Sequence, residues 1–466
     1  MTRANDFAGY LLMGLVVLSP IPFGSNPPFF WTLSGLIVGL GAAAYFLVAL
    51  SGGHELRVPL ARLRIYIVLW LALAVWLCVQ ALPLGAIVGP FQFKLADGSL
   101  LESMSLSLAP DSTLLMLIRN TSYALLFLLA VQAGANGSRA RLILTVIFWG
   151  IVAHAGFSLI QLTQLGDTSL GFPKTAYLGV ATGTFVNRNS FATFLAVGLS
   201  LGAGLIPGLI LAPKARNQRP GDTTFKVILQ FAGMFVILVA LLATQSRMGL
   251  FAGLVGVFVV MLLILSRLPR AALSIPVAVL VALVLGVGAT WFYGQGVLTR
   301  ALDLNDSTVG RLDLYQQVMA MIELRPWLGY GGGAFDVAFP AFFGPPLNLS
   351  IVYSKAHSTY LTLVTELGLV AALLPMILVG LIFVRMVWAQ FAASEINGPR
   401  IAALGAVIVV VIHSTVDFSL EIQANAYLLA ALGGVGLAST FAMPIRRAKT
   451  SARVAVNGGA DPAVQL

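Results

Sequence analysis

The chain has 466 residues, of which 59% are hydrophobic and only 9% are charged, and its formal net charge at pH 7 is +10. Soluble domains contain about 25% charged residues and about 45–50% apolar ones. The composition therefore excludes a cytosolic enzyme, a disordered protein and a nucleic-acid-binding domain, and it indicates an all-α polytopic membrane protein.

Apolar runs that are long enough to cross a bilayer recur along the chain. A membrane core about 30 Å thick requires about 20 apolar residues per helix. The first run has no small-x-small cleavage site and is interrupted by Pro20 and Pro22, so we interpret it as a retained span rather than a signal peptide. In total the pattern predicts twelve transmembrane helices, at residues 7–23, 28–50, 64–82, 112–133, 142–164, 189–211, 225–243, 248–265, 271–293, 357–387, 401–419 and 424–443.

Lysine and arginine are distributed unequally between the two sides of this arrangement. The even-numbered connections and both termini contain most of the 27 Lys and Arg residues but few of the 17 Asp and Glu residues. By the positive-inside rule, both termini are predicted to be cytoplasmic. Spans one to nine then occupy residues 1–293, and a large outer loop occupies residues 294–356. The last three spans occupy residues 357–443, and residues 444–466 form a disordered basic cytoplasmic tail.

The outer loop is unusually long and contains a helical pattern. Loops of more than about 12–15 residues are usually functional or disordered. Within residues 310–324 the apolar side chains repeat at helical spacing, which predicts an ordered amphipathic helix at the membrane interface. Its apolar face is expected to comprise Leu312, Tyr315, Met319 and Ile322.

Three arginines near the outer membrane boundary are candidates for an anion site. Arg188 lies between Asn187 and Asn189 at the mouth of span six. Arg247 lies in the tight turn before span eight, and Arg311 opens the predicted amphipathic helix. Guanidinium groups bind phosphate oxygens in pairs, and helix N-termini favour anions, so a lipid-linked diphosphate is one possible ligand. The alternative is that these arginines extend to water or anchor lipid head groups.

Histidines and carboxylates at the same boundary are candidate acid–base groups. His357 precedes span ten, where a helix N-terminus favours a neutral imidazole that can accept a proton; the alternative is a histidine that only forms hydrogen bonds. Glu366 falls on the opposite face of a regular helix, so the two are not expected to share a site. His413, Asp417 and Glu421 form a predicted stripe on span eleven, with a proton relay, an acceptor-binding wall and a buried hydrogen-bond network as alternatives.

Nucleotide and metal motifs are missing from the sequence. It contains no Walker A motif, no GxGxxG after a strand, no HExxH and no DxD with metal spacing. We therefore expect no cofactor and no metal ion, and an activated group donor that comes from the membrane.

Five segments resemble the O-antigen ligase and O-antigen polymerase superfamily. In chain order they are Gly183–Ala192, Ser246–Gly249, Gly310–Arg311, Arg325–Gly331 and Ala356–Gly368. The resemblance covers residues 180–370 in detail, and the twelve-span plan extends it over the chain. It implies a GT-C-like glycosyltransferase of the bacterial inner membrane that moves a glycan from undecaprenyl diphosphate to an acceptor hydroxyl on the periplasmic face, with inversion and without a metal.

The resemblance also implies roles for individual residues. Arg188 and Arg247 would bind the diphosphate, and His357 would orient or deprotonate the acceptor hydroxyl. Arg311 and Glu366 match family positions whose roles are less well defined.

The nature of the acceptor separates two functions in this superfamily. A ligase of lipopolysaccharide biosynthesis delivers the glycan to lipid A–core, which is the function that we favour from the sequence. A polymerase joins it to a second lipid-linked repeat, and the segment His413–Leu420 resembles relatives from exopolysaccharide clusters. A lipid-linked glycan or solute transporter is the competing class, although the sequence shows no inverted repeat with paired broken helices.

Overall fold

The computed structural model describes residues 2–52, 55–211, 221–267, 304–348, 352–393 and 395–441. Within these residues the chain is mainly helical, and nine helices are long and apolar enough to cross a membrane. The predicted all-α polytopic fold is therefore confirmed. The predicted span at 271–293 and the tail 444–466 lie outside the described residues.

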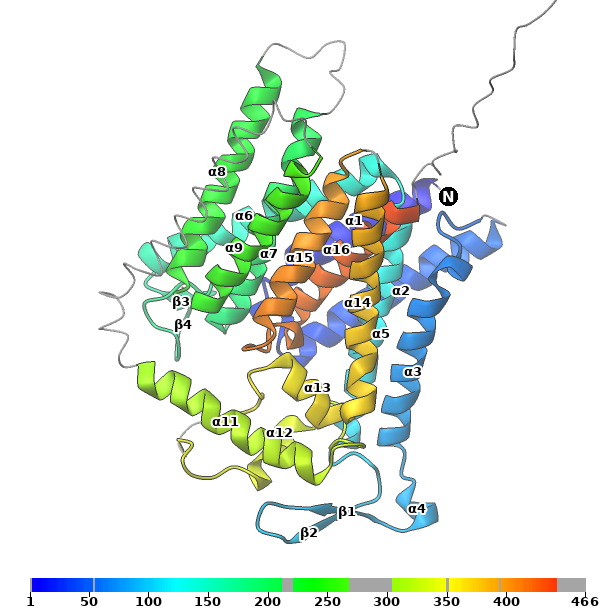
Figure 1. The fold of residues 1–466 in the computed structure, drawn as a ribbon, viewed down its shortest axis with the longest axis vertical. Helices are drawn as coiled ribbons and strands as arrows, with labels where there is room; N and C mark the ends of the chain where they lie inside the picture. Colours follow the sequence, from blue (N-terminus) through cyan, green and yellow to red (C-terminus); the bar gives the residue numbers. More distant parts are fainter. Residues whose placement is uncertain are drawn as a thin grey trace, which may run out of the picture.

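The long helices follow the predicted spans closely. The nine that meet the length and hydropathy requirement are α2 (Pro28–Ser51), α3 (Arg64–Ala81) with the 3-10 turn η2 (Leu60–Leu63) before it, α5 (Pro110–Gly134), α6 (Gly137–Thr163), α7 (Arg188–Ile210), α8 (Asp222–Ala243), α9 (Arg247–Leu265), α14 (Leu369–Ala392) and α16 (Gln423–Phe441). The shorter helices α1 (Thr2–Leu18) and α15 (Gly398–His413) run through the same bundle (Figure 1). A short turn, η1 (Phe23–Ser25), separates α1 from α2.

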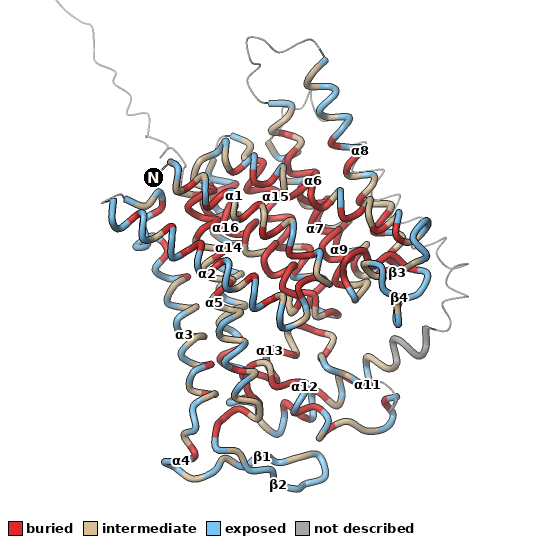
Figure 2. Tube along the Cα trace, turned by 180° about the vertical axis from the view of Figure 1, so that it is seen from behind, coloured by how far each residue is buried: buried red, intermediate tan, exposed pale blue. Residues whose placement is uncertain are grey.

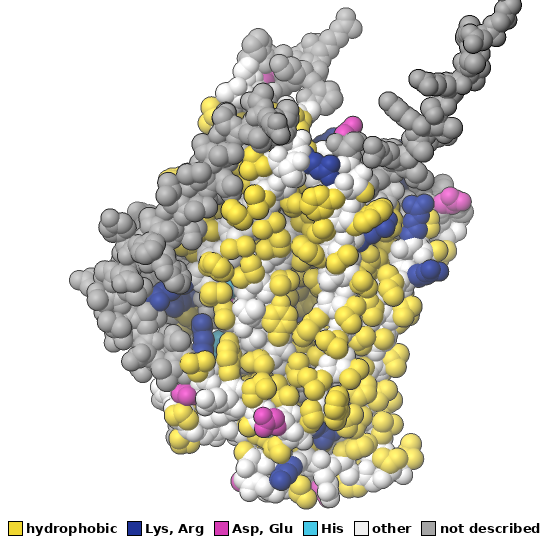
Figure 3. Space-filling model, in the orientation of Figure 1, with side chains coloured by type: hydrophobic (Ala, Val, Ile, Leu, Met, Phe, Trp, Pro, Cys, Tyr) yellow, Lys and Arg dark blue, Asp and Glu magenta, His cyan; other side chains and the backbone are white. Residues whose placement is uncertain are grey.

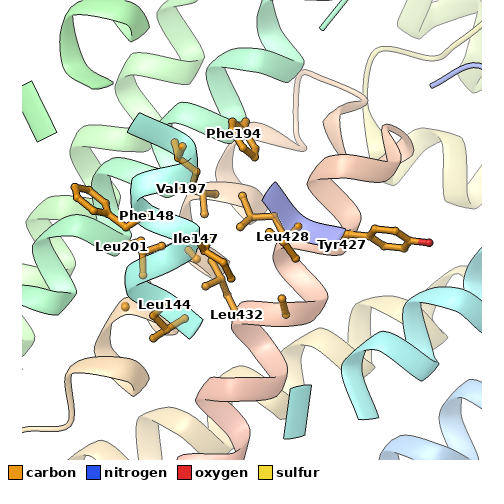
Figure 4. Close-up of a cluster of buried hydrophobic side chains, with 14 of the residues drawn as sticks. Leu144, Ile147, Phe148, Phe194, Val197, Leu201, Tyr427, Leu428 and Leu432 are labelled. Carbon is orange, nitrogen blue, oxygen red and sulfur yellow. The ribbon is translucent and has the colours of Figure 1, made fainter. Parts of the chain in front are cut away.

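Helices α7 and α16 occupy the centre of the bundle. Their apolar segments are 78% and 83% buried, against 22% for α14 at the periphery, and the buried residues gather in the middle of the bundle (Figure 2). Figure 4 shows part of this core, where side chains of α6, α7 and α16 such as Phe148, Leu201 and Leu432 pack together. Small residues permit the close approach of helices, since a Cβ on Gly204 would lie 2.6 Å from the Cα of Ala402 in α15.

The two ends of the bundle differ in character. At one end, which we call the basic end, lie the N-terminus and the connections at 52–59, 135–136 and 393–397 (Figure 1). Figure 3 shows Lys and Arg side chains near this end, a hydrophobic band below them, and a second small group of Lys, Arg and His side chains beyond the band. The orientation of these two ends in the membrane stays a prediction.

A folded cap covers the opposite end and comprises residues 85–108, 310–348 and 352–367. Strand β1 (Phe91–Lys94) pairs antiparallel with β2 (Leu100–Ser103), with Phe91 opposite Ser103. The cap also contains α4 (Gly85–Val88), most of α11 (Leu304–Leu324), α12 (Phe335–Ala338), η4 (Phe339–Ala341) and α13 (Thr359–Leu367). Its own hydrophobic core includes Phe93, Leu314, Val318, Tyr330, Phe335 and Phe339. The hairpin was not part of the sequence prediction.

Arg325 joins the two segments of the cap. Its guanidinium carbon lies 3.8 Å from the centre of the Phe93 ring, and its Nη1 donates to the carbonyl of Gln92 at 3.3 Å. The Nε atom donates to the carbonyl of Gly329 at 2.6 Å. One side chain therefore holds the hairpin and the turn after α11 together.

The predicted continuous helix at 357–387 is wrong, because the structure divides it at Gly368. This residue has φ of 80°, and a Cβ on it would lie 2.1 Å from the carbonyl oxygen of Trp327. The carbonyls of Thr365 and Glu366 accept hydrogen bonds from the amides of Tyr330 and Gly331, each at 2.9 Å. These contacts with the cap end α13 and start α14 in a new direction.

The amphipathic helix exists, but it begins earlier than predicted. Helix α11 begins at Leu304 rather than Gly310. Of the four residues predicted to share the apolar face, Leu312 and Met319 are 58% and 45% exposed. Ile322, the fourth of them, is buried and packs onto the cap core together with Leu314, Val318 and Met321.

Candidate functional site

Arg188 and Arg247 each occupy the first position of a helix at the cap end of the bundle. Helix α7 begins at Arg188, and the side chain of its N-cap Asn187 accepts hydrogen bonds from the amides of Asn189 and Ser190 at 2.7 and 3.2 Å. Helix α9 begins at Arg247, with Ser246 as its N-cap. A helix N-terminus attracts anions, and an arginine at the first position adds to that attraction.

A hydrogen bond ties the two helix N-termini together. The Ser246 hydroxyl donates to Oδ1 of Asn189 at 2.9 Å, and Gly249 packs closely against Ala192. Among the described residues, neither arginine has an ion-pair partner, and the buried Nε of Arg188 has no hydrogen-bond partner there. The two helix N-termini that begin with these arginines are therefore held together, and Arg188 has an unused donor.

Tyr177 lies next to Arg188 and Asn187, and it was not predicted from the sequence as a site residue. The guanidinium of Arg188 lies 5.7 Å from the centre of its ring, and Asn187 donates to its hydroxyl at 3.1 Å. The residue belongs to the connection between α6 and α7, which contains the short strands β3 (Thr168–Ser169) and β4 (Phe172–Pro173). Asp167 braces this connection by accepting from the amide of Gly179 at 2.6 Å and from Lys174.

His357 lies two residues before α13 and not within the helix. Its φ of 52° is in the left-handed region, its ring lies edge-on to Phe418 at 5.0 Å, and its carbonyl accepts from the Tyr315 hydroxyl at 2.9 Å. Burial, and after it the charge of Arg311, lower the pKa of the imidazole to about 4. The ring is therefore neutral at pH 7, as expected, but burial and Arg311 are the causes rather than a helix N-terminus. The buried Nδ1 has no partner among the described residues.

Arg311 links the separate parts of the site electrostatically. It lies about two turns into α11, whereas the sequence placed it at the start of the helix. Its positive charge acts on the neighbouring His357, Tyr177 and Asp417. Arg188 of α7 and Arg311 of α11 both act on Tyr177 and therefore face the same region.

The predicted stripe on span eleven is wrong, because α15 ends at His413. Asp417 lies in the following turn and Glu421 in η5 (Ser419–Glu421). The carbonyls of Ser414 and Asp417 each accept from the amide of Thr359 at 3.1 Å. This tertiary contact replaces another turn of helix.

His413 and Asp417 nevertheless meet through a chain of hydrogen bonds. His413 Nδ1 contacts the hydroxyl of Thr193, which donates to Ser419 at 2.7 Å, and Ser419 in turn donates to Asp417. His413 and Asp417 thus take part in a buried hydrogen-bond network, while a role in a proton relay or in acceptor binding stays a prediction. Burial raises the pKa of Asp417 to about 6.

Glu366 makes polar contacts with the cap and with α3. Its Oε1 accepts from the amide of Phe335 at 3.4 Å, and its backbone carbonyl accepts from Gln80 of α3 at 3.0 Å. The side chain is 2% exposed, and burial raises the pKa of the carboxyl to about 7, against the opposing charge of Lys355. Glu366 thus supports the segment 329–335 at the cap end.

Comparison with known families finds a match in the middle section of the chain. Residues 232–376 match the family model described as O-antigen ligase. This section of the chain is therefore similar to the O-antigen ligase superfamily. The matched segment contains Arg247, Arg311, His357 and Glu366, whereas Arg188 precedes it. No curated protein matches the chain.

The match and the apolar helices together indicate a general class of protein. The chain is a multi-pass helical membrane protein, and its middle section resembles membrane glycosyltransferases of the O-antigen ligase and polymerase type. At this site, the arginines can neutralise an anionic group and the buried imidazole can accept a proton. Among the described residues, no three His, Cys, Asp or Glu side chains gather as a metal ion would require; metal independence stays a prediction.

Proposed function

We propose that this protein transfers a glycan from undecaprenyl diphosphate to a hydroxyl of lipid A–core, on the periplasmic face of the inner membrane. One observation carries the proposal: Arg188 and Arg247 stand at two helix N-termini joined by the 2.9 Å bond from Ser246 to Asn189. Such an arrangement is an anion site with two charged, bidentate donors. The superfamily supplies the nature of the anion, a lipid-linked saccharide.

The proposed chemistry is a direct displacement at the anomeric carbon. The acceptor oxygen forms a bond to this carbon while the bond to the diphosphate oxygen breaks, so the configuration inverts. Negative charge grows on the leaving diphosphate, and fixed arginines stabilise it. His357 orients the acceptor hydroxyl or takes its proton, with no metal ion or cofactor involved.

Binding of the donor also adjusts the basicity of His357. In the free protein, the charge of Arg311 helps to hold the pKa of this ring near 4. A bound diphosphate neutralises part of the positive charge around the ring, and its own negative charge favours the imidazolium. The ring therefore becomes a stronger base when the donor is present, which is when a base is required.

Charge distribution supports the proposed orientation. The basic end contains Arg139 and Arg400 (Figure 1), and positive charge favours the cytoplasmic side. Both termini are then cytoplasmic, and the cap and the arginines face the periplasm. The packed apolar centre in Figure 4 agrees with chemistry at one face better than with a polar transport path.

Reconstitution with purified substrates tests the proposal. The protein is incorporated into vesicles together with an undecaprenyl-diphosphate-linked glycan and offered lipid A–core in one reaction and only further lipid-linked glycan in another. Glycan attached to lipid A–core supports the ligase. Longer lipid-linked glycan in the second reaction alone identifies a polymerase instead, and movement of intact donor across the vesicle membrane without any transfer identifies a transporter.

A further inference from the structure

A second group of charged side chains lies close to His357 and is separate from the arginines of the anion site. Lys355 Nζ lies 3.1 Å from Oε2 of Glu421. Arg119 of α5 donates from Nη2 to the backbone carbonyl of Glu421 at 2.6 Å, and its guanidinium carbon lies 5.1 Å from the centre of the Trp31 ring. Residues from α2, α5, the cap and η5 thus converge here.

This group has hydrogen-bonding capacity that the described residues leave unused. Oε1 of Glu421 and Nε of Arg119 are buried, and neither has a partner among those residues. Buried polar atoms are almost always paired in native proteins. The Lys355 side chain is 31% exposed, so a ligand can reach the group from that side. The Oε1 acceptor of Glu421 and the Nε donor of Arg119 are therefore available to a polar ligand.

The charges of the group nearly balance. The ammonium of Lys355 and the guanidinium of Arg119 face two carboxyl groups, Glu421 and Glu366, and the negative charges of Glu421 and Glu366 outweigh burial and raise the pKa of Lys355. A phosphate would be repelled by the carboxylates, whereas a neutral group with hydroxyls would bind to both the donors and the acceptors. The balance distinguishes this group from the cationic site at Arg188 and Arg247.

The group is also adjacent to the candidate base. Lys355 precedes His357 by two residues, and Phe418, which contacts the His357 ring at 5.0 Å, precedes Glu421 by three. A sugar bound to these side chains would lie beside the imidazole.

We propose that Arg119, Lys355 and Glu421 form the subsite that binds the acceptor sugar and directs one of its hydroxyls to His357. This inference depends on the proposed function, because it assigns the second substrate to the same site. The three side chains would act in binding and positioning, with Glu421 accepting hydrogen bonds from sugar hydroxyls and Arg119 and Lys355 donating to sugar oxygens.

The variants Glu421→Gln and Lys355→Met test the subsite in the reconstituted reaction. Loss of a charge-assisted hydrogen bond is expected to raise the KM for the acceptor about tenfold, with the KM for the donor unchanged. Asp6→Asn is the matched control, since it removes the 2.8 Å ion pair with Arg139 at the basic end and should leave both KM values unchanged. An unaltered acceptor KM, or a rise in the donor KM instead, overturns the proposal.

Exchanging the charges of Lys355 and Glu421 distinguishes a role in sugar binding from a purely structural role. The double variant Lys355→Glu with Glu421→Lys keeps an ion pair but reverses the positions of donor and acceptor. If the pair only stabilises the fold, the acceptor KM returns to that of the unmodified protein. If the pair binds sugar, the KM stays raised.

Direct binding distinguishes failure of the subsite from failure of the proposed function. Lipid-free core oligosaccharide is titrated into the full-length protein in detergent, without any donor. Binding that Glu421→Gln weakens about tenfold and Arg188→Ala leaves unchanged supports the subsite, even if no transfer is seen. No binding, or equal binding by the unmodified protein and Glu421→Gln, overturns the subsite and leaves the transfer reaction to its own test.

Discussion

The hydroxyl of Ser246 and the side-chain oxygen of Asn189 are 2.9 Å apart, and this hydrogen bond connects the first turns of α9 and α7. Each of the two residues adjoins an arginine of the anion site. The bond therefore sets the separation of Arg188 and Arg247, and it provides a way to disturb their geometry without removing either charge.

Ser246→Ala is expected to weaken donor binding several-fold, because the arginines lose their fixed separation. The variant also loses the N-cap of α9, at a cost of about 1 kcal/mol. Asn136→Ala is the control, since it removes a cap of similar kind from α6 at the basic end. Both variants should unfold at a lower temperature, but only Ser246→Ala should raise the KM for the donor. Equal donor KM values in the two variants would contradict this role.

Removal of either arginine is expected to reduce kcat by about 10²–10³-fold, as for other groups that stabilise developing charge. The measurement is the rate of glycan transfer at saturating donor by Arg188→Ala and Arg247→Ala. Arg141→Ala, at an exposed position near the basic end, should retain the full rate. Normal transfer by both site variants at normal expression would remove them from the mechanism.

His357 is expected to destabilise the folded protein in acid. The unfolded ring binds a proton below about pH 6.5, while the folded ring stays neutral down to about pH 4. Stability therefore falls as the pH decreases through this window, by up to about 3 kcal/mol from this group. Thermal unfolding at pH 7.5 and pH 5 should show a smaller loss for His357→Gln than for the unmodified protein. An identical loss in both would mean that the ring is accessible to protons in the folded state.

Glu366 is expected to have the opposite effect on stability. Its folded pKa of about 7 lies above the ordinary value of 4.5, so its contribution is complete below about pH 4.5 and is lost as the pH rises through 7. Glu366→Gln imitates the protonated form and should gain stability relative to the unmodified protein between pH 6 and pH 8.5. The difference in unfolding temperature between the two proteins, measured at both pH values, checks the sign. A difference that shrinks with rising pH would contradict it.

Gly368→Ala is expected to destabilise the junction of α13 and α14. The new methyl group would overlap the carbonyl of Trp327, and φ of 80° is unfavourable for alanine, at a cost of about 1–3 kcal/mol. Gly380→Ala is the control on the same helix, because a Cβ there meets nothing within 4 Å. The first variant should unfold at a lower temperature and the second should not. Equal unfolding temperatures would show that the junction tolerates a regular helix.

The sequence predicts the transmembrane helices well because their cause is local. A run of about 20 apolar residues crosses a bilayer as a helix whatever its neighbours are. The starts of α7 and α9 were predicted at residues 189 and 248, and the helices begin at Arg188 and Arg247. The two arginines were therefore expected close to these helix starts.

The missed features depend on contacts between distant segments. Gly368 looks like an ordinary glycine in an apolar run, and only the carbonyl of Trp327 reveals the break. Likewise α15 stops at His413 because its following carbonyls bind Thr359 from another element. Tyr177 lies in a connection without periodicity, so no pattern marked it. In each case the deciding partner is far away in the sequence.

The position of Arg325 has a consequence for the evolution of this protein. Its guanidinium rests on Phe93 and binds the backbone on either side of the hairpin, at Gln92 and Leu106. Two loops that are more than 200 residues apart in the chain are thus expected to change together during evolution. A chimera that takes residues 310–348 from a relative must also take residues 85–108 from the same relative. Otherwise the two segments of the cap will not pack against each other correctly.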